Sequence, residues 1–249
     1  MNKKTSLIIS FLITVLLTFN YFILRDQFIP KIQREIVFVS RIIDGDTLEL
    51  EDGRILRLLN INTQEKNDFG SNESIAYLKE IENSQVEIEI TGIDKYKRYL
   101  ARIFAPNYIN IELVRLGLAT KYLVSSEELS DFLQAEKYAI ENEAGLWEKS
   151  QGYGCLTASI EPDEETLILY NSCNPINLTG WIIRDESRKK FILEGTLDKE
   201  LKIFSFEGQN TKNSYFLNSN TNIWNNDRDT IYLMDKDNKI ALYKPYGYP

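Results

Sequence analysis

The residues in this chain that are best suited to chemistry are carboxylates and arginines, because the sequence contains no histidine. They gather in three clusters, at 44–47 (Asp-Gly-Asp-Thr), at 57–65 (from Arg57 to Glu65) and at 94–98 (Asp-Lys-Tyr-Lys-Arg). The lack of histidine excludes a histidine base, a HExxH zinc site and a Ser-His-Asp triad. The two cysteines are too few for a four-thiolate zinc site. Any hydrolysis must therefore rest on carboxylates, arginines and a hard metal ion.

Such a set of groups suits attack on a phosphodiester. In-line attack builds negative charge on the equatorial oxygens, and two guanidinium groups with a divalent cation would stabilise that charge. A carboxylate is the natural base here, and calcium accepts oxygen ligands in irregular geometry. Taken singly, however, each cluster has an ordinary alternative: a turn for 44–47, an ion pair on a strand for Arg57, and a solvated loop for 94–98.

The elements that must position these clusters have the pattern of a small β-barrel. Apolar and alternating runs predict strands at 37–43, 47–50, 55–61, 86–90 and 100–104, with a hairpin turn at Asp52-Gly53. Helical spacing predicts three helices, at 71–83, 111–118 and 127–143, with Ser71 and Asn110 as caps of the first two. Five strands and three helices in about 115 residues fit a closed barrel.

The second half of the chain is predicted to be all β. A short polar, glycine-bearing joint at 149–154 marks the boundary. Beyond it, β-runs at 166–170, 181–184, 190–193, 201–206, 215–217, 230–234 and 239–243 are separated by breaks rich in Asn, Asp, Gly and Lys. This spacing favours an antiparallel sandwich.

The N-terminal end contains an apolar segment. Residues 6–24 carry no charge, and as a helix they would be roughly 28 Å long, close to the thickness of the hydrocarbon core of a bilayer. Lys3 and Lys4 precede the segment, and no small-residue cleavage site follows it. An uncleaved membrane anchor is favoured over a removed signal peptide or a buried core helix, with the bulk of the chain outside the membrane.

The net charge of the chain is −8, and most of the acidity lies within 36–150. A protein that binds nucleic acid through general phosphate neutralisation is expected to be basic. The bulk charge therefore gives no support for strong non-specific binding, although local charge can differ.

Together the three clusters resemble the staphylococcal nuclease-like (thermonuclease) family over roughly 37–148. Their order and spacing match, as do the later stretches at 113–119 (Leu-Val-Arg-Leu-Gly-Leu-Ala) and 144–147 (Ala-Gly-Leu-Trp). The resemblance implies a five-stranded OB-fold β-barrel and calcium-dependent hydrolysis of phosphodiester bonds in DNA or RNA.

The resemblance also implies a Ca2+ site. Asp46 would be a ligand through its carboxylate and Thr63 through its backbone carbonyl. Asn62 stands where the family typically has a second aspartate, so a weaker affinity for calcium is expected. Gln64 replaces the usual proline before the glutamate, and Lys97 replaces the glycine before the second arginine.

The catalytic residues implied by the resemblance are Glu65, Arg57 and Arg98. Glu65 would orient or deprotonate the attacking water, and the two arginines would clamp the phosphate. The tyrosines that stack on the nucleotide in the best-known member are not matched at their positions. The residues nearest to such a role are Lys95, Tyr96 and Tyr122.

The second half resembles a lamin-tail domain, through Leu-Thr-Gly-Trp at 178–181 and Asp-Thr-Ile-Tyr-Leu at 229–233. This resemblance implies an immunoglobulin-like β-sandwich without catalysis, which could contact a surface partner. The basic run at 188–190 (Arg-Lys-Lys) is either a solvated turn or a phosphate-facing patch. Cys155 and Cys173 form either a disulfide, if the domain is extracellular, or two buried thiols.

The sequence thus predicts three parts, a membrane anchor and linker at 1–35, a nuclease-like OB-fold domain at 36–149 and a lamin-tail-like sandwich at 155–249. The fold is mainly β. The expected protein is a monomeric nuclease of DNA or RNA, held at the cell membrane by one span and facing outward, or secreted if the segment is cleaved. The alternative is a catalytically weak or inactive protein that binds nucleic acid or a surface polymer.

Overall fold

The structure, a computed structural model, describes residues 11, 13–18, 34–66 and 68–248. Its internal contacts divide the chain into two units, Met1–Arg34 and Glu35–Pro249, which are described separately. The expected anchor at 6–24 lies mostly outside the described residues. Among the residues that are described, no helix combines the length and the apolarity that a membrane crossing requires.

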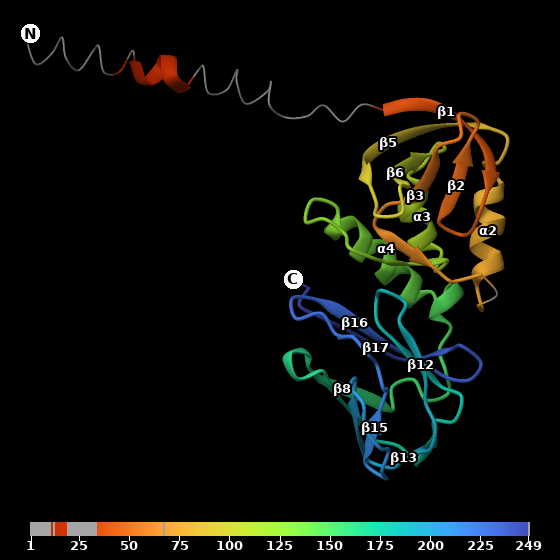
Figure 1. The fold of residues 1–249 in the computed structure, drawn as a ribbon, viewed down its shortest axis with the longest axis vertical. Helices are drawn as coiled ribbons and strands as arrows, with labels where there is room; N and C mark the ends of the chain where they lie inside the picture. The colour runs from red at the N-terminus through yellow and green to blue at the C-terminus, as the bar shows by residue number, and fades with distance from the viewer. Residues whose placement is uncertain (1–10, 12, 19–33, 67, 249) are drawn as a thin grey trace, which may run out of the picture. The chain divides into compact units, whose positions relative to one another are not determined.

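Five strands close into a barrel in the order β1-β2-β3-β6-β5 (Figure 1). Their bounds are β1 (Arg34–Ile42), β2 (Thr47–Leu50), β3 (Ile55–Leu58), β5 (Gln85–Ile93) and β6 (Tyr99–Phe104). β3 and β6 pair in parallel, and the pairs β1–β2, β2–β3 and β5–β6 are antiparallel. Alternate apolar side chains of these strands, such as Leu48, Leu56 and Ile88, are fully buried in the core. The expected five-stranded barrel with helices is confirmed.

Three α-helices accompany the barrel: α2 (Ser71–Lys79), α3 (Ile109–Arg115) and α4 (Leu129–Glu141), followed by the 3-10 turn η1 (Gly145–Trp147). The expected caps are wrong. Gly70 precedes α2, and Ser71 is already helical. Asn110 lies inside α3, where its side chain donates to the carbonyls of Leu59 and Ala101 and so ties the helix to the barrel.

The strand expected at 55–61 is interrupted. β3 ends at Leu58, and Asn60 adopts a left-handed backbone with φ of 68°. The chain then starts β4 (Ile61–Thr63), which pairs with β7 (Ala119–Lys121) in a separate two-stranded sheet. This break turns residues 61–63 out of the barrel wall and toward the loop between β1 and β2.

Two four-stranded sheets, β12-β11-β16-β17 and β15-β14-β9-β8, and the pair β10-β13 make up residues 156–246, here called the C-terminal sheets. Their strands are β8 (Leu156–Glu161), β9 (Thr166–Asn171), β10 (Ile176–Asn177), β11 (Ile182–Arg184), β12 (Lys190–Ile192), β13 (Thr196–Leu197), β14 (Glu200–Phe204), β15 (Ser214–Phe216), β16 (Asp229–Met234) and β17 (Ile240–Tyr246), with the 3-10 turn η2 (Pro162–Glu164) after β8. The expectation for this half missed β8, β10 and β13.

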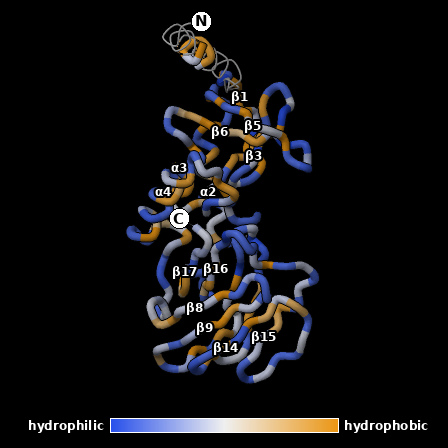
Figure 2. Tube along the Cα trace, turned by 90° about the vertical axis from the view of Figure 1, so that its left-hand side faces the viewer, coloured by the Kyte–Doolittle hydropathy of each residue, from blue (hydrophilic) through white to orange (hydrophobic). Residues whose placement is uncertain are grey.

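The two larger sheets share one apolar core. Leu169 of β9 and Ile203 of β14 belong to the same buried cluster as Ile183 of β11 and Leu233 of β16. Hydrophobic positions recur along the strands of this region (Figure 2). The shared core explains why buried and exposed side chains alternate along the strands, since each sheet buries one face against the other.

The barrel and the C-terminal sheets are joined by direct contacts within the second unit. Trp147 packs in a small buried cluster with Tyr232 and Ile240. The amide of Ser150 donates to the carbonyl of Ile240 at 2.9 Å, so the joint expected at 149–154 is hydrogen-bonded to β17. A fully buried Lys121 of β7 also links the two parts, through Glu136 of α4 at 3.3 Å and Glu186 at 2.9 Å.

Cys155 and Cys173 form a disulfide that closes a segment with a sequence separation of 18. The bond connects the start of β8 to the loop after β9, at one edge of the sheet that these strands share. The choice between a disulfide and two buried thiols is thus decided in favour of the disulfide.

Replacing both cysteines by serine is expected to lower the free energy of unfolding by about 3 kcal/mol, because the cross-link restricts the unfolded chain. For a chain of this size, that corresponds to a melting temperature lower by about 6 to 12 °C. Thermal melts of the wild type and the double variant, each with and without reductant, measure the effect. If reductant does not change the melting temperature of the wild type, the assignment of the disulfide is contradicted.

Candidate active site

The loop between β1 and β2 presents Asp46 to the interior of the site. Asp46 is only 3% exposed. Its amide donates to Asp44 Oδ1 at 2.9 Å, which closes the Asp-Gly-Asp turn. A Cβ on Gly45 would lie 2.2 Å from Ser74 Oγ and 2.7 Å from Thr63 Oγ1, so the glycine is required by close packing. The motif therefore fixes where the Asp46 carboxylate points.

The Asp46 carboxylate is the centre of a buried set of polar contacts. Its Oδ2 accepts hydrogen bonds from Thr63 N at 3.1 Å and Thr63 Oγ1 at 3.2 Å. The same oxygen lies 3.1 Å from Arg57 Nη2. Burial and the negative charge of Asp46 raise the pKa of the neighbouring Asp44 carboxyl. Positive charge is thus needed here to keep several carboxylates together.

Arg57, on β3, supplies part of this positive charge. It is 7% exposed, and its guanidinium donates to the carbonyls of Leu58 and Ile61 and to Asn62 Oδ1. Burial lowers the pKa of Arg57, and the negative charge of Asp46 acts in the opposite direction. The Arg57 guanidinium stays protonated, because arginine is not deprotonated in proteins. Asn62 Oδ1 accepts a hydrogen bond from Arg57, and Asn62 Nδ2 donates to the carbonyl of Glu186 at 2.8 Å.

Arg98 is held by the loop between β5 and β6. Asp94 accepts hydrogen bonds from the amides of Tyr96 and Arg98 and from Arg98 Nε at 2.8 Å. Lys97 adopts a left-handed φ of 68°, a conformation that glycine takes without strain. The guanidinium carbon of Arg98 lies 5.4 Å from the centre of the Tyr96 ring. The loop thus orients a partly exposed guanidinium and an exposed aromatic ring together.

Two pockets, of about 600 and 560 Å³, surround these groups and share Tyr96, Arg98 and Arg188. The first is also lined by Asp44, Asp46, Thr63 and Glu65. The second is also lined by Arg57, Asn62, Lys95 and Tyr122. Every site residue expected from the sequence therefore lines one pocket or the other, and none lies on a different face of the barrel.

Glu65 lies at the rim of the first pocket, with a side chain that is 62% exposed. Its Oε1 lies 3.0 Å from Nη2 of Arg188, which comes from the turn between β11 and β12. Nη1 of the same arginine donates to the Thr63 carbonyl at 2.8 Å. Arg188 was not among the expected site residues. The only signal for it in the sequence was the basic run at 188–190.

Oxygen atoms from Asp46, Thr63 and Glu65 converge on one point of the first pocket. Among the described residues, no group of three or more His, Cys, Asp or Glu side chains is close enough to hold a metal ion. A site here must therefore combine carboxylates with a backbone carbonyl, both of which calcium accepts. Asp46 Oδ2, the Thr63 carbonyl and Glu65 Oε1 already face one positive group, the Arg188 guanidinium.

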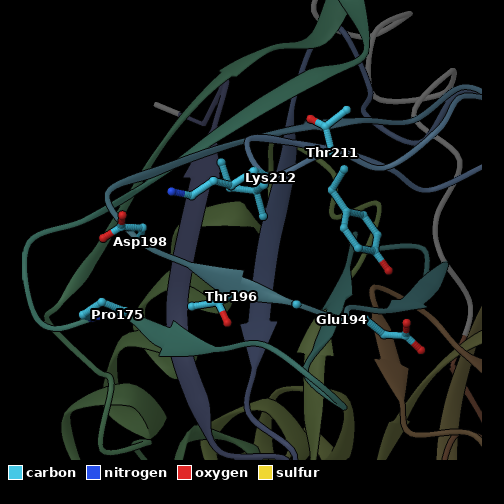
Figure 3. Close-up of a pocket in the computed structure, with 9 residues that line it drawn as sticks. Pro175, Glu194, Thr196, Asp198, Thr211 and Lys212 are labelled. Carbon is cyan, nitrogen blue, oxygen red and sulfur yellow. The ribbon is translucent and has the colours of Figure 1, made fainter.

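A further pocket, of about 420 Å³, lies within the C-terminal sheets and is lined by nine residues between 175 and 215 (Figure 3). Glu194, Asp198 and Lys212 border it, and it contains no residue of the barrel. Its lining has no arginine pair facing carboxylates. The chemistry expected from the sequence therefore belongs to the two pockets of the barrel.

Part of this chain is similar to known proteins. Residues 55–149 match the family described as staphylococcal nuclease homologue. An uncharacterized endonuclease of Escherichia coli O157:H7 is 32% identical over 116 residues, covering 44% of this chain and 74% of the relative. An uncharacterized protein of Methanocaldococcus jannaschii is 31% identical over 144 residues, covering 44% of this chain and 70% of that protein. The chain belongs to the family of staphylococcal nuclease homologues.

Proposed function

We propose that this protein hydrolyses phosphodiester bonds of DNA or RNA and that it depends on calcium. The observation that carries the proposal is the meeting of Asp46, Glu65, Arg57 and Arg98 around two adjoining pockets. Kinship with the nuclease family and with a relative described as an endonuclease supports the reaction class.

Glu65 is the base or water-orienting group. Its carboxylate is exposed and pairs with Arg188 through Oε1, so Oε2 can reach a water molecule at the mouth of the first pocket. Arg57 and Arg98 stabilise the negative charge that develops on the phosphoryl oxygens. Arg57 is rigidly held by backbone carbonyls, and Arg98 is the more exposed of the two.

Asp46 and the carbonyl of Thr63 would hold the calcium ion. When bound, calcium supplies a positive charge that polarises the phosphoryl group. Thr63 also donates to Asp46 through its amide and hydroxyl, which keeps the carboxylate turned toward the pocket. Direct binding by Asn62 stays a prediction, because its amide oxygen accepts from Arg57 in this structure.

The residues that would contact the substrate are Lys95, Tyr96 and Tyr122, which line the second pocket. Tyr96 is 67% exposed, so its ring can stack on a base. Lys95 adds a positive charge near the same ring, with Nζ 5.0 Å from its centre. The local excess of positive groups here offsets the acidity of the rest of the chain.

We also propose that the protein works outside the cytoplasm, held by the segment 6–24 or released after its cleavage. The disulfide supports an oxidising compartment. The domain limits 36–149 and 155–249 and the lamin-tail identity of the second domain are part of the same proposal. The common core of its two sheets supports an immunoglobulin-like sandwich that could bind a surface partner.

Glu65→Gln is expected to reduce turnover by roughly 10²- to 10⁴-fold, because the amide cannot accept the proton of the attacking water. The whole chain in a mild non-ionic detergent is assayed on single-stranded DNA with calcium, and a chelator should stop cleavage by the wild type. The melting temperature should hardly change, since the side chain is mostly exposed.

Glu73→Gln is the matched control, because Glu73 is an exposed glutamate on α2 that lines neither barrel pocket. It should cleave as the wild type does. A Glu65→Gln variant of full activity would refute the assigned role, and a wild type that binds DNA without cutting it would favour the binding-protein alternative.

Arg98→Gln is expected to lower turnover on the order of 10²- to 10³-fold, because one donor to the developing charge is lost. The control is Arg115→Gln, which also removes an arginine paired with a nearby carboxylate, that of Glu112, but on α3 and outside both pockets. The steady-state cleavage rates of Arg98→Gln and Arg115→Gln are measured and compared, and melting curves show whether each variant is folded. Equal losses in both variants would mean that Arg98 acts only through general charge.

A further inference from the structure

The turn between β11 and β12, residues 185–189, brings Arg188 of the C-terminal sheets into the nuclease site. Nη1 of Arg188 donates to the Thr63 carbonyl at 2.8 Å and lies 3.6 Å from Asp46 Oδ2. Nη2 lies 3.0 Å from Glu65 Oε1. These three oxygens belong to the residues to which the proposed function assigns the calcium ion and the attacking water.

The turn itself is anchored in the barrel by Glu186, two residues before Arg188. The Glu186 carbonyl accepts a hydrogen bond from Asn62 Nδ2 at 2.8 Å, and its carboxylate accepts from Lys121 Nζ at 2.9 Å. The hydroxyl of Tyr248 donates to the same carboxylate. Withdrawing the turn would leave buried charges unpaired, which is strongly unfavourable. If the Arg188 guanidinium leaves the three oxygens, it must therefore do so by rotation of its own side chain and not by movement of the turn.

Two features indicate that Arg188 does more than complete a turn. Its backbone has a left-handed φ of 73°. This conformation destabilises the fold when the residue is an arginine, whereas a glycine would adopt it without strain. Its Nε is buried and has no hydrogen-bond partner among the residues that the structure describes. The turn is already closed by Asp185, whose carboxylate accepts from Ser187 Oγ and the Lys189 amide. The long charged side chain is thus not required for the turn.

We propose that Arg188 acts as an internal cation that competes with calcium for Asp46, Thr63 and Glu65, and so raises the calcium concentration that the site requires. This inference rests on the proposed function for the identity of the metal. A guanidinium and a calcium ion cannot share these oxygens, because both would occupy the same volume and like charges repel. Calcium binding must therefore displace Arg188 from its three partners.

The charged groups around Arg188 support a competition of this kind. Arg57, Lys95 and Arg98 line the second pocket with it, so four positive groups already stand there before calcium arrives. The opposing carboxylates that line the first pocket are Asp44, Asp46 and Glu65. Removing one guanidinium would leave the carboxylates with less compensation and a greater attraction for a divalent ion.

The test is calcium binding by isothermal titration calorimetry, without substrate, on the whole wild-type chain and on Arg188→Gln. Arg188→Gln should bind calcium about tenfold more tightly, because about 1.4 kcal/mol of competition is removed. Arg188→Lys keeps the charge but lacks the planar fork that reaches separate acceptors through two nitrogens, so its calcium affinity should fall between those of the wild type and Arg188→Gln.

Lys190→Gln is the matched control, because it removes the same charge two residues away. Its Nζ contacts Asp68 at 2.7 Å and none of the three oxygens, so its calcium affinity should match that of the wild type. Unchanged or weaker calcium binding by Arg188→Gln would overturn the proposal. An equal gain in Lys190→Gln would also overturn it, because the effect would then be general charge.

A second measurement serves if Arg188→Gln fails to fold. In the wild type, the ¹⁵N signal of the Arg188 side chain should shift on addition of calcium, as its partners are lost. A signal that stays in place while calcium binds would overturn the proposal. Failure of the proposed nuclease function can be distinguished from failure of this inference. In that case the wild type would not cut DNA, whatever its calcium affinity.

Discussion

The site depends on one buried carboxylate and on the positive charge that it must have beside it. Asp46 is almost fully buried and receives two hydrogen bonds from Thr63 as well as the Arg57 guanidinium. A buried carboxylate without such partners would be costly or would take up a proton. The break of the chain at Asn60, the packing of Gly45 and the burial of Arg57 all serve to bring these groups together.

The same charge balance supports the proposal that an acidic protein acts on an acidic polymer. The chain carries a net charge of −8, yet the second pocket is lined by Arg57, Lys95, Arg98 and Arg188, and Asp94 is the only acidic residue among the described ones that line it. The substrate therefore meets a local field that differs in sign from the field of the whole chain. Bulk charge alone would have argued against a nucleic-acid substrate.

The C-terminal sheets are part of this arrangement. The turn that bears Arg188 is fixed to β4 and β7 through Asn62, Glu186 and Lys121. A nuclease-like barrel without this second half would lack a guanidinium at the oxygens of Asp46, Thr63 and Glu65. The combination of the two halves thus gives the site a property that neither half has by itself.

The sequence predicted the barrel well because its strands alternate and its clusters sit at loops between them. The positions of Asp46, Arg57, Glu65 and Arg98 around adjoining pockets follow from that order along the chain. The left-handed turn at Asn60 was missed, because a single asparagine within an apolar run is a weak signal against a continuous strand. Arg188 could not be placed, because contacts between residues more than 120 positions apart leave no local pattern.

A crystal structure of the chain grown with calcium and a short oligonucleotide tests the central claim most directly. We expect calcium on Asp46 and the Thr63 carbonyl, a phosphate between Arg57 and Arg98, and Arg188 withdrawn from Asp46, the Thr63 carbonyl and Glu65. Calcium bound elsewhere at saturating concentration, with Arg188 still on Asp46 and Glu65, would contradict it.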